Sequence, residues 1–299
     1  MDARVKFDLQ SWSGERLDRV ERALSRWVIA DAPAGLGDAM RYAVLDGGKR
    51  LRPLLVLAAS EAVDGSEEAA LRAACAVELI HAYSLVHDDM PCMDNDVLRR
   101  GKPTVHVRYG QAQALLAGDA LQALAFELLA PEGVAVPAAV QAALCRLLAR
   151  AAGHAGMAGG QAIDLANVGR SLTEAQLREM HVRKTGALLQ ASVLMGAACG
   201  VSNAAAQSAL AAYGEAVGLA FQVVDDILDV TADSATLGKT AGKDAAHDKP
   251  TYVALLGLER STAFAQELLA QALAALERTG LRDTRALHAL AIMVVNRDN

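Results

Sequence analysis

The chain has 299 residues, a formal net charge of −6 and only four cysteines. This acidic balance, with no long basic run, argues against nucleic acid as the main partner. Hydrophobic residues make up 53% of the chain and charged residues 21%, so we expect a sizeable core rather than disorder. The cysteines are far apart and form no CxxC pair, which argues against a disulfide framework or a zinc site and fits a reducing cytoplasm.

The composition favours close-packed helices, because aromatics are only 4% and alanine is abundant. Residues 1–30 are expected to form an N-terminal helical segment, and they contain no apolar run typical of a secretory signal. Thr173 followed by Glu174 indicates a helix start. No linker divides the chain, so we expect a single domain over residues 1–299. Breaks between helices are expected at Asp31–Gly37, Asp64–Glu67, Pro131–Val136, Asn167–Ser171 and Thr231–Pro250.

One long stretch of the chain carries no charge. It runs for 30 residues from Thr185 to Gly214, which exceeds the roughly 20 residues that span a bilayer. Polar residues such as Gln190 and Asn203 interrupt it, and much of the remainder is Ala and Gly. We therefore expect a buried pair of helices here, and no transmembrane segment.

A cluster of aspartates follows Phe221 in an otherwise apolar helix. Four polar side chains share one face of that helix, at i, i+3, i+4 and i+7: Gln222, Asp225, Asp226 and Asp229. A solvated acidic face would be the ordinary explanation, but the surrounding residues are apolar. The pattern indicates a stripe that faces a cavity with bound cations, and its all-oxygen ligands favour Mg²⁺.

A second acidic cluster spans residues 88–96. Asp88 and Asp94 lie six residues apart, on roughly opposite sides of a regular helix. Pro91 removes a backbone hydrogen bond, and the resulting distortion is expected to return Asp94 toward Asp88. Upstream, His81 shares a helix face with Asp88, where it is either a core histidine or part of the same site.

Two basic patches accompany the acidic clusters, at residues 47–53 and 98–104. Glycines beside Lys and Arg suit phosphate oxygens, although the spacing is not that of a Walker loop. In a chain of net charge −6, the combination indicates a polyanion held partly by metal and partly directly. Residues 231–250, which are mostly small and polar, are expected to form an active-site lid loop.

Six blocks together resemble the trans-isoprenyl diphosphate synthases, and within them the bacterial farnesyl diphosphate synthases. In chain order they are GGKRLRP (47–53), DDMPCMD (88–94), LRRGKPT (98–104), GGQAIDL (159–165), KTGALL (184–189) and FQVVDDILD (221–229). The match runs from about Tyr42 to Leu256. The resemblance implies an all-α, single-domain isoprenoid synthase-type bundle of long helices around a central cavity, and a homodimer.

The resemblance also implies an activity: head-to-tail condensation of isopentenyl diphosphate with dimethylallyl or geranyl diphosphate, releasing pyrophosphate. It implies Mg²⁺, three ions per site with diphosphate bound and Mn²⁺ as a substitute, held by Asp88, Asp94 and Asp225. Supporting these ligands would be Asp89, Asp226 and Asp229. The allylic diphosphate would be bound by Arg99, Lys184, Thr185, Gln222, Lys239 and Lys249. Isopentenyl diphosphate would be bound by Lys49, Arg52, His81 and Arg100.

The expected catalytic residues are Lys184, Thr185 and Gln222. Ionisation of the allylic C–O bond develops negative charge on the pyrophosphate and positive charge on the allyl group. Cations already in place stabilise the negative charge on the pyrophosphate, and the oxygens of Thr185 and Gln222 stabilise the positive charge on the allyl group. The departing pyrophosphate accepts the final proton, so the chemistry needs no general base with a tuned pKa.

Tyr83 and Ser84 are the residues that bear on product length. Tyr83 lies five residues before Asp88, about 7.5 Å along a helix axis. Its ring would admit a C15 chain and obstruct a C20 chain, so we expect (2E,6E)-farnesyl diphosphate; Ser84 is too small to set the limit. If Tyr83 is instead ordinary core packing, facing about 140° away from Asp88, geranyl and geranylgeranyl diphosphate stay open as products.

Two rival functions conflict with the residues present. A non-catalytic partner subunit should have lost part of an aspartate motif or a diphosphate lysine, and none is lost. A terpene cyclase has no use for a second diphosphate site such as the patch at residues 47–53. The C-terminal residues 294–299 include Arg297, which either covers a diphosphate or belongs to a frayed terminus.

Overall fold

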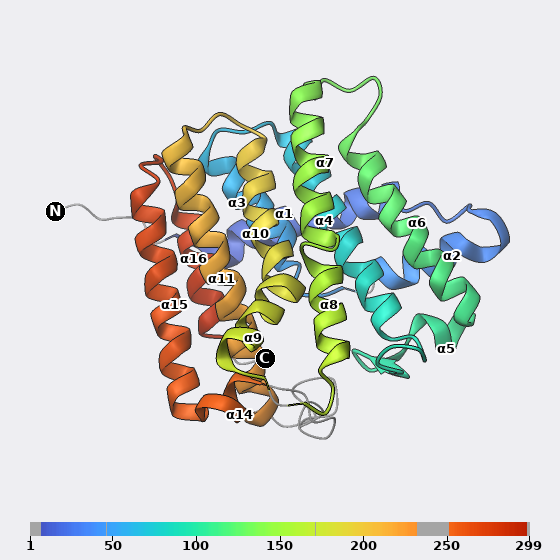
Figure 1. Cartoon of the computed structure of the whole chain (residues 1–299). Helices are drawn as coiled ribbons and strands as arrows, with labels where there is room; N and C mark the ends of the chain where they lie inside the picture. The colour runs from blue at the N-terminus through green and yellow to red at the C-terminus, as the bar shows by residue number, and fades with distance from the viewer. Residues whose placement is uncertain (1–6, 46, 171, 232–250, 298–299) are drawn as a thin grey trace.

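The computed structural model describes residues 7–45, 47–170, 172–231 and 251–297, and almost all of its regular structure is helical (Figure 1). The first half contains α1 (Leu9–Trp27), the 3₁₀-helix η1 (Pro33–Gly35), α2 (Leu36–Val44), α3 (Leu51–Ala62), α4 (Glu67–Asp88), α5 (Val105–Tyr109) and α6 (Gln111–Leu129). The second half contains α7 (Ala138–Ala152), α8 (Met157–Ala166), α9 (Glu174–His181), η2 (Val182–Gly186), α10 (Ala187–Ala198), α11 (Ala204–Thr231), α14 (Tyr252–Leu256), α15 (Leu258–Arg278) and α16 (Arg285–Val295). The all-α prediction is confirmed.

Two local features were not expected from the sequence. The strands β1 (Leu98–Arg99) and β2 (Lys102–Pro103) pair antiparallel as a minimal hairpin, with Leu98 opposite Pro103. The segment η2 is a π-helix that leads directly into α10. Both features lie in segments that carry predicted site residues.

Most predicted helix boundaries are confirmed. The gaps between α3 and α4, α6 and α7, and α8 and α9 fall where Gly, Pro and Asn cluster. The predicted start of α9 has a capping box, in which the Thr173 hydroxyl accepts from the Gln176 N–H and the Gln176 side chain accepts from the Thr173 N–H. The first break is shifted, because α1 ends at Trp27 and α2 already begins at Leu36.

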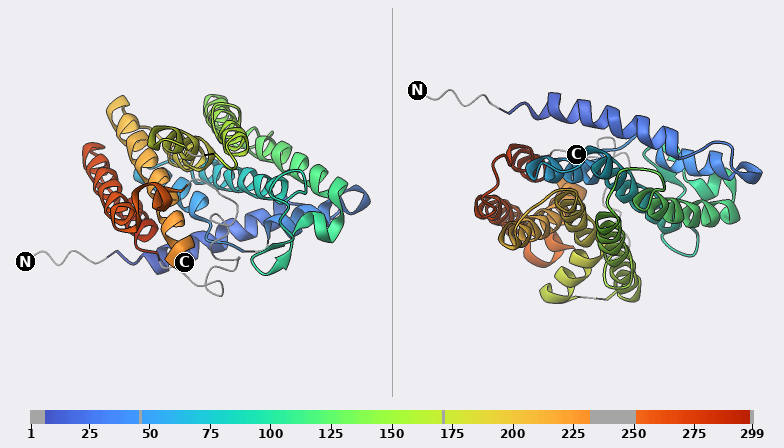
Figure 2. Two further views of the ribbon diagram at one scale, coloured as in Figure 1. Left: turned by 60° about the horizontal axis from the view of Figure 1, so that its bottom comes forward. Right: turned by 90° about the horizontal axis from the view of Figure 1, so that it is seen from above.

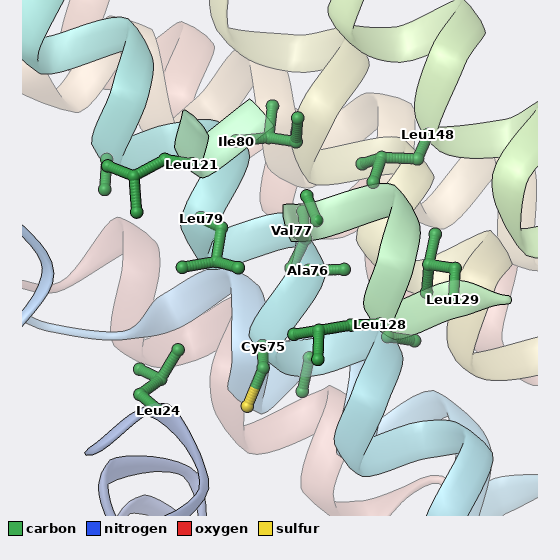
Figure 3. Close-up of a cluster of buried hydrophobic side chains, with 14 of the residues drawn as sticks. Leu24, Cys75, Ala76, Val77, Leu79, Ile80, Leu121, Leu128, Leu129 and Leu148 are labelled. Carbon is green, nitrogen blue, oxygen red and sulfur yellow. The ribbon is translucent and has the colours of Figure 1, made fainter. Parts of the chain in front are cut away.

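Helix α4 lies at the centre of the largest hydrophobic cluster. Ser66 caps its start by accepting from the N–H of Ala69, and Glu67 and Glu68 occupy the first turn, where acids complement the helix dipole. Its buried alanines allow α6 and α3 to approach closely, and larger side chains such as Leu79 and Ile80 fill the remaining space (Figure 3). The packing holds α4 rigidly up to its final residue, Asp88.

Helix α1 runs crosswise along one side of the bundle (Figure 2). It packs against α3, α4 and α16. The charge-free stretch forms the buried helix α10 and the beginning of α11, as predicted. Helix α10 packs against α3 closely enough that a Cβ on Gly196 would overlap the backbone of Val56.

Among the described residues, two helices, α4 and α6, have the length and apolar composition of a membrane span. The most apolar window of α4 is 72% buried and that of α6 is 39% buried within the protein. These two helices also pack along each other. Neither is therefore a clear transmembrane segment, because core helices meet the same criteria.

Candidate active site

A cavity of about 370 Å³ opens between α3, α4, α8 and η2. A cavity of this size with a few convergent polar groups is typical of a small-molecule site. The polar part of its wall is formed by Arg52, His81, Ser84, His87, Asp88, Gln161, Lys184 and Thr185. Six of these eight were predicted site residues, and they come from segments more than 100 residues apart in the chain.

The first aspartate cluster lies where α4 ends. The N–H of Asp94 donates to the carbonyl oxygen of Asp88 at 2.8 Å, so Asp94 does return to Asp88, through a helix end rather than a distorted helix. Burial raises the pKa of Asp88 to about 6; the Lys184 ammonium opposes this rise and the Asp94 carboxylate adds to it. A buried carboxylate beside a second one favours a bound cation.

Asp89 holds an arginine beside this cluster. The Nε and Nη2 atoms of Arg99 lie 2.6–3.0 Å from the two carboxylate oxygens of Asp89. The Asp89 side chain is 4% exposed and that of Arg99 is 36% exposed. Burial raises the pKa of Asp89, and its hydrogen bonds with Arg99 lower it. The pairing with Asp89 holds the positively charged guanidinium of Arg99 near Asp88.

The second aspartate cluster lies on α11, and its three carboxylates differ in access. Asp226 is buried and accepts from Gln222 Nε2 at 2.9 Å and from the backbone N–H of Tyr252 at 2.7 Å. Asp229 is also buried. The Asp225 side chain, by contrast, is 42% exposed. Asp225 is therefore the member of the cluster that an incoming group reaches most readily.

Arg297 contacts the second cluster from the other end of the fold. Its Nη2 lies 2.5 Å from Asp225 Oδ1 and donates to the carbonyl oxygen of Phe221 at 2.8 Å. The guanidinium also lies 3.9 Å from the centre of the Phe221 ring, and the side chain is only 8% exposed. The Arg297 guanidinium therefore lies where a cation would approach Asp225.

Lys184 and Thr185 lie in the π-helix η2, where the extra residue in the turn changes the direction of their side chains. Lys184 Nζ lies 2.5 Å from Asp164 Oδ2. The Thr185 hydroxyl donates to Gln222 Oε1 at 3.1 Å, which brings these two predicted catalytic residues together. A third oxygen-bearing side chain, Gln161, lies in the same cavity wall, and its amide has no hydrogen-bond partner among the described residues.

The first basic patch lies near the second. Arg100 donates through Nη1 to the carbonyl oxygen of Gly47 at 2.6 Å. Arg52 Nε is buried and has no hydrogen-bond partner within the described ranges. Burial, followed by the charges of Arg52 and Arg100, lowers the pKa of His81 well below its ordinary value. Burial and then the charge of Arg297 lower the pKa of Lys49. This concentration of positive charge suits an anion.

The aspartates fit a hard cation that shares its ligands with a substrate. Among the described residues, no group of three or more His, Cys, Asp or Glu side chains is arranged to hold a metal by itself. Mg²⁺ is commonly bound by one or two carboxylates, with waters and phosphate oxygens completing the octahedron. Asp88 with Asp94 after the end of α4, and Asp225 on α11, supply such partial sets.

Tyr83 and Ser84 both line the cavity with Asp88. The Tyr83 ring is edge-on to the His87 ring, with centroids 5.7 Å apart, and burial raises the pKa of its hydroxyl while a hydrogen bond with Gln122 lowers it. Tyr83 thus lines the cavity and also packs against the hydrophobic cluster around α4, so its part in product length stays a prediction. Ser84 donates its hydroxyl to the carbonyl of His81 at 2.8 Å.

Some predicted residues lie outside the described ranges, and some functional contacts were missed. Lys239 and Lys249, like the expected lid apart from Thr231, lie outside the described residues. The sequence did not reveal the contacts of Asp164 with Lys184 or of Arg297 with Asp225. The GGQAIDL block marked Asp164 as a residue of interest, but only the fold shows that its partner is Lys184.

Comparison with known proteins agrees with this architecture. The polyprenyl synthetase family model matches residues 33–289. A probable farnesyl diphosphate synthase of Bradyrhizobium diazoefficiens is 50% identical over 280 residues, covering 92% of this chain and 84% of that protein. A chloroplastic geranylgeranyl pyrophosphate synthase of Capsicum annuum is 46% identical over 295 residues, covering 98% of this chain and 80% of that protein.

The solved structures with the same fold include an enzyme with ligands bound. The geranyltransferase from Helicobacter pylori, complexed with magnesium and isoprenyl diphosphate, superposes with a TM-score of 0.84 at 35% identity, covering 98% of each chain. The family match covers most of the chain, and four of the six sequence blocks, at residues 47–53, 88–94, 159–165 and 184–189, contribute residues to one cavity. The chain therefore belongs to the polyprenyl synthetase family of prenyltransferases.

Proposed function

We propose that this protein is an Mg²⁺-dependent farnesyl diphosphate synthase. It condenses isopentenyl diphosphate head-to-tail with dimethylallyl and then geranyl diphosphate, releasing pyrophosphate at each step. The observation that carries this proposal is that Asp88, Lys184 and Arg52 line one cavity together with Tyr83. Metal-ligand, diphosphate-binding and chain-limiting groups thus share one space. Magnesium bound with isoprenyl diphosphate in the Helicobacter pylori structure supports the choice of metal.

The proposed roles divide the site between its two substrates. Mg²⁺ is held by Asp88, Asp94 and Asp225, with support from Asp89, Asp226 and Asp229. The allylic diphosphate is bound by Arg99, Lys184, Thr185 and Gln222, and isopentenyl diphosphate by Lys49, Arg52, His81 and Arg100. Lys239 and Lys249, outside the described residues, belong to the proposed allylic set by resemblance.

The geometry accounts for how these residues promote ionisation. When bound, Mg²⁺ supplies charge neutralisation for the leaving pyrophosphate. Lys184, oriented by Asp164 at 2.5 Å, contributes a second positive charge at the same place. The oxygens of Thr185 and Gln222, 3.1 Å apart, present negative dipoles to the allylic carbons without forming a bond to them. Burial, together with the positive charges around it, lowers the pKa of His81, so a neutral His81 donates a hydrogen bond to diphosphate.

The C15 product is proposed from Tyr83, because its ring lines the cavity beyond Asp88. The known relatives support both C15 and C20, since one is named as a farnesyl and another as a geranylgeranyl synthase. A geranylgeranyl diphosphate synthase is thus the second candidate function. It is favoured by similarity to the Capsicum annuum enzyme over 98% of this chain, and opposed by the bulk of Tyr83.

We also propose a cytoplasmic homodimer. Val107 on α5 and Leu115 and Leu116 on α6 are each 47–52% exposed, which gives these neighbouring helices an apolar face for a second copy. All four cysteines are free, as in a reducing compartment. Light scattering after size-exclusion chromatography would measure the oligomeric state.

Chromatography of the reaction products tests the proposed activity. The purified protein would be incubated with geranyl and isopentenyl diphosphates and Mg²⁺, and the prenyl chains would be separated by length. We expect C15 as the main product and no turnover with EDTA. A main product of C20 would favour the second candidate, and the absence of any condensation product would contradict both.

A further inference from the structure

Arg50, in the GGKRLRP block, has a buried side chain that forms ion pairs with two other helices. This side chain is 3% exposed. Nε lies 2.7 Å from Glu21 Oε1 on α1, and Nη1 lies 2.6 Å from Glu78 Oε1 on α4. Nη2 donates to the carbonyl oxygen of Val44 at 2.6 Å. A further contact joins Nη2 to Glu21 Oε2 at 3.4 Å, so four of the five N–H donors of Arg50 are used within the protein. The burial of the side chain keeps a diphosphate away from the fifth.

The backbone of Arg50 is also unusual. Its φ of 46° and ψ of 33° lie in the left-handed region, which L-residues other than glycine seldom adopt. The Arg50 carbonyl oxygen accepts from the N–H of Leu54 and so begins α3. Lys49 directly precedes this residue, and Arg52 follows it in the first turn of α3. The conformation of Arg50 therefore sets where both neighbouring cations lie.

Glu78 connects this residue electrostatically to the rest of the patch. It is 4% exposed and lies on α4 one turn before His81. Its charge acts on Arg52 and Arg100 as well as on Arg50. Glu21 completes the cluster from α1, with a side chain that is 39% exposed. The cluster joins three helices at the loop that carries Lys49.

We propose that Arg50, clamped between Glu21 and Glu78, is a positioning residue that holds Lys49 and Arg52 in place for the diphosphate of isopentenyl diphosphate. It does so without touching the substrate. This inference rests on the proposed function. It gives α1, through Glu21, an indirect part in substrate binding. Within the basic run, Arg50 positions the chain while Lys49 and Arg52 contact the diphosphate.

The test uses Glu21→Gln, which weakens the clamp at its exposed end and leaves the buried Glu78 in place. We expect the KM for isopentenyl diphosphate to rise about fivefold or more, while kcat and the KM for geranyl diphosphate stay within about twofold. Arg50→Lys should act in the same direction, because an ammonium has only three donors and cannot reproduce the four contacts that Arg50 makes with Glu21, Glu78 and Val44. Calorimetric binding of isopentenyl diphosphate to each variant would accompany the kinetics.

Glu61→Gln is the matched control. Glu61 pairs with Arg16 of α1 at 3.0 Å and is 43% exposed, so its substitution also removes a carboxylate that anchors α1, away from the diphosphate patch. Its KM for isopentenyl diphosphate should not change. An unchanged KM in Glu21→Gln, or an equal rise in Glu61→Gln, would overturn the inference. If the wild-type protein neither binds nor condenses isopentenyl diphosphate, the proposed function fails and the inference falls with it.

Discussion

The ring of Tyr83 lines the cavity wall beside Ser84 and Asp88, and its edge faces the ring of His87. His87 is itself held from α6, where the carbonyl oxygen of Leu115 lies 3.1 Å from Nε2. The ring is therefore supported from behind by another helix. A supported ring would not yield easily to a growing chain, so we expect its bulk to limit product length under the proposed function.

Replacing Tyr83 with Ala should lengthen the product. We expect the main product to shift from C15 to C20 or longer, with the first condensation largely retained, because the change opens space without touching a charged group. Product chromatography from geranyl diphosphate would measure the shift. Ser84→Ala is the control and should still release C15. A Tyr83→Ala variant that is folded and active but stops at C15 would show that another residue limits the chain.

His181 is a second residue with a measurable consequence. It is 6% exposed and stacks on Tyr252 with ring centroids 5.5 Å apart, and both ring nitrogens lack hydrogen-bond partners among the described residues. Burial lowers the pKa of His181 to about 4, below the 6.5 of a free histidine. The unfolded chain therefore takes up this proton first as the pH falls, and the native state loses stability from about pH 6.5 down to about pH 4.

His181→Phe should remove this part of the pH dependence. Between pH 7 and pH 5, the wild-type free energy of unfolding should fall by about 2 kcal/mol more than that of the variant. Urea unfolding at several pH values would measure both. Parallel pH profiles would show that the imidazole is protonated equally well in the folded and unfolded states.

At the scale of single elements, the π-helix η2 depends on a glycine of its neighbour. Gly160 on α8 lies so close to η2 that a Cβ on it would overlap the backbone N and Cα of Lys184. The GGQAIDL block thus meets Lys184 in two ways. Asp164 pairs with its ammonium, and Gly160, which has no side chain, leaves room for its backbone. Two blocks that are separate in the sequence form one contact.

Gly160→Ala should displace η2 and with it Lys184. We expect a loss of stability of about 1–3 kcal/mol from overpacking, together with a fall in kcat of tenfold or more, equivalent to about 1.4 kcal/mol in the barrier. Thermal unfolding and steady-state kinetics would measure these. Gly14→Ala is the control, since a Cβ there meets nothing within 4 Å, and it should be neutral or slightly stabilising. Near-wild-type kinetics in a folded Gly160→Ala protein would contradict this account.

At the scale of the whole molecule, the end of the chain returns to the second aspartate cluster. Arg297 and Asp225 are 72 residues apart in sequence and 2.5 Å apart in the fold. The guanidinium neutralises the most accessible carboxylate of that cluster. An ion approaching Asp225 must therefore compete with Arg297.

Arg297→Gln should raise the affinity of the substrate-free protein for a divalent cation, because the competing charge is removed. We expect binding of Mn²⁺ to tighten severalfold, by about 1 kcal/mol, as measured by the loss of the free Mn²⁺ signal in electron paramagnetic resonance. Arg285→Gln, at the start of the helix α16 that precedes Arg297, removes an arginine paired with exposed Asp283 and should leave the affinity unchanged. Weaker Mn²⁺ binding in Arg297→Gln would contradict competition at Asp225.

The sequence alone determined the helical class, most helix boundaries and the stripe of acids on α11, because each depends on residues within a few turns of one another. It also predicted the return of Asp94 to Asp88, which a local turn achieves. Composition and spacing sufficed for these because helix formation and capping are local.

Only the tertiary structure decided which cations remain for a ligand and which are used within the protein. Arg50 lies between Lys49 and Leu51 in one basic run, and its side chain is enclosed by carboxylates from α1 and α4. The tertiary structure likewise decided that Arg297 pairs with Asp225 and that Tyr83 lies in the cavity wall. Burial and pairing between distant segments set these outcomes, and a charged or aromatic side chain carries no local sign of the partner it will meet.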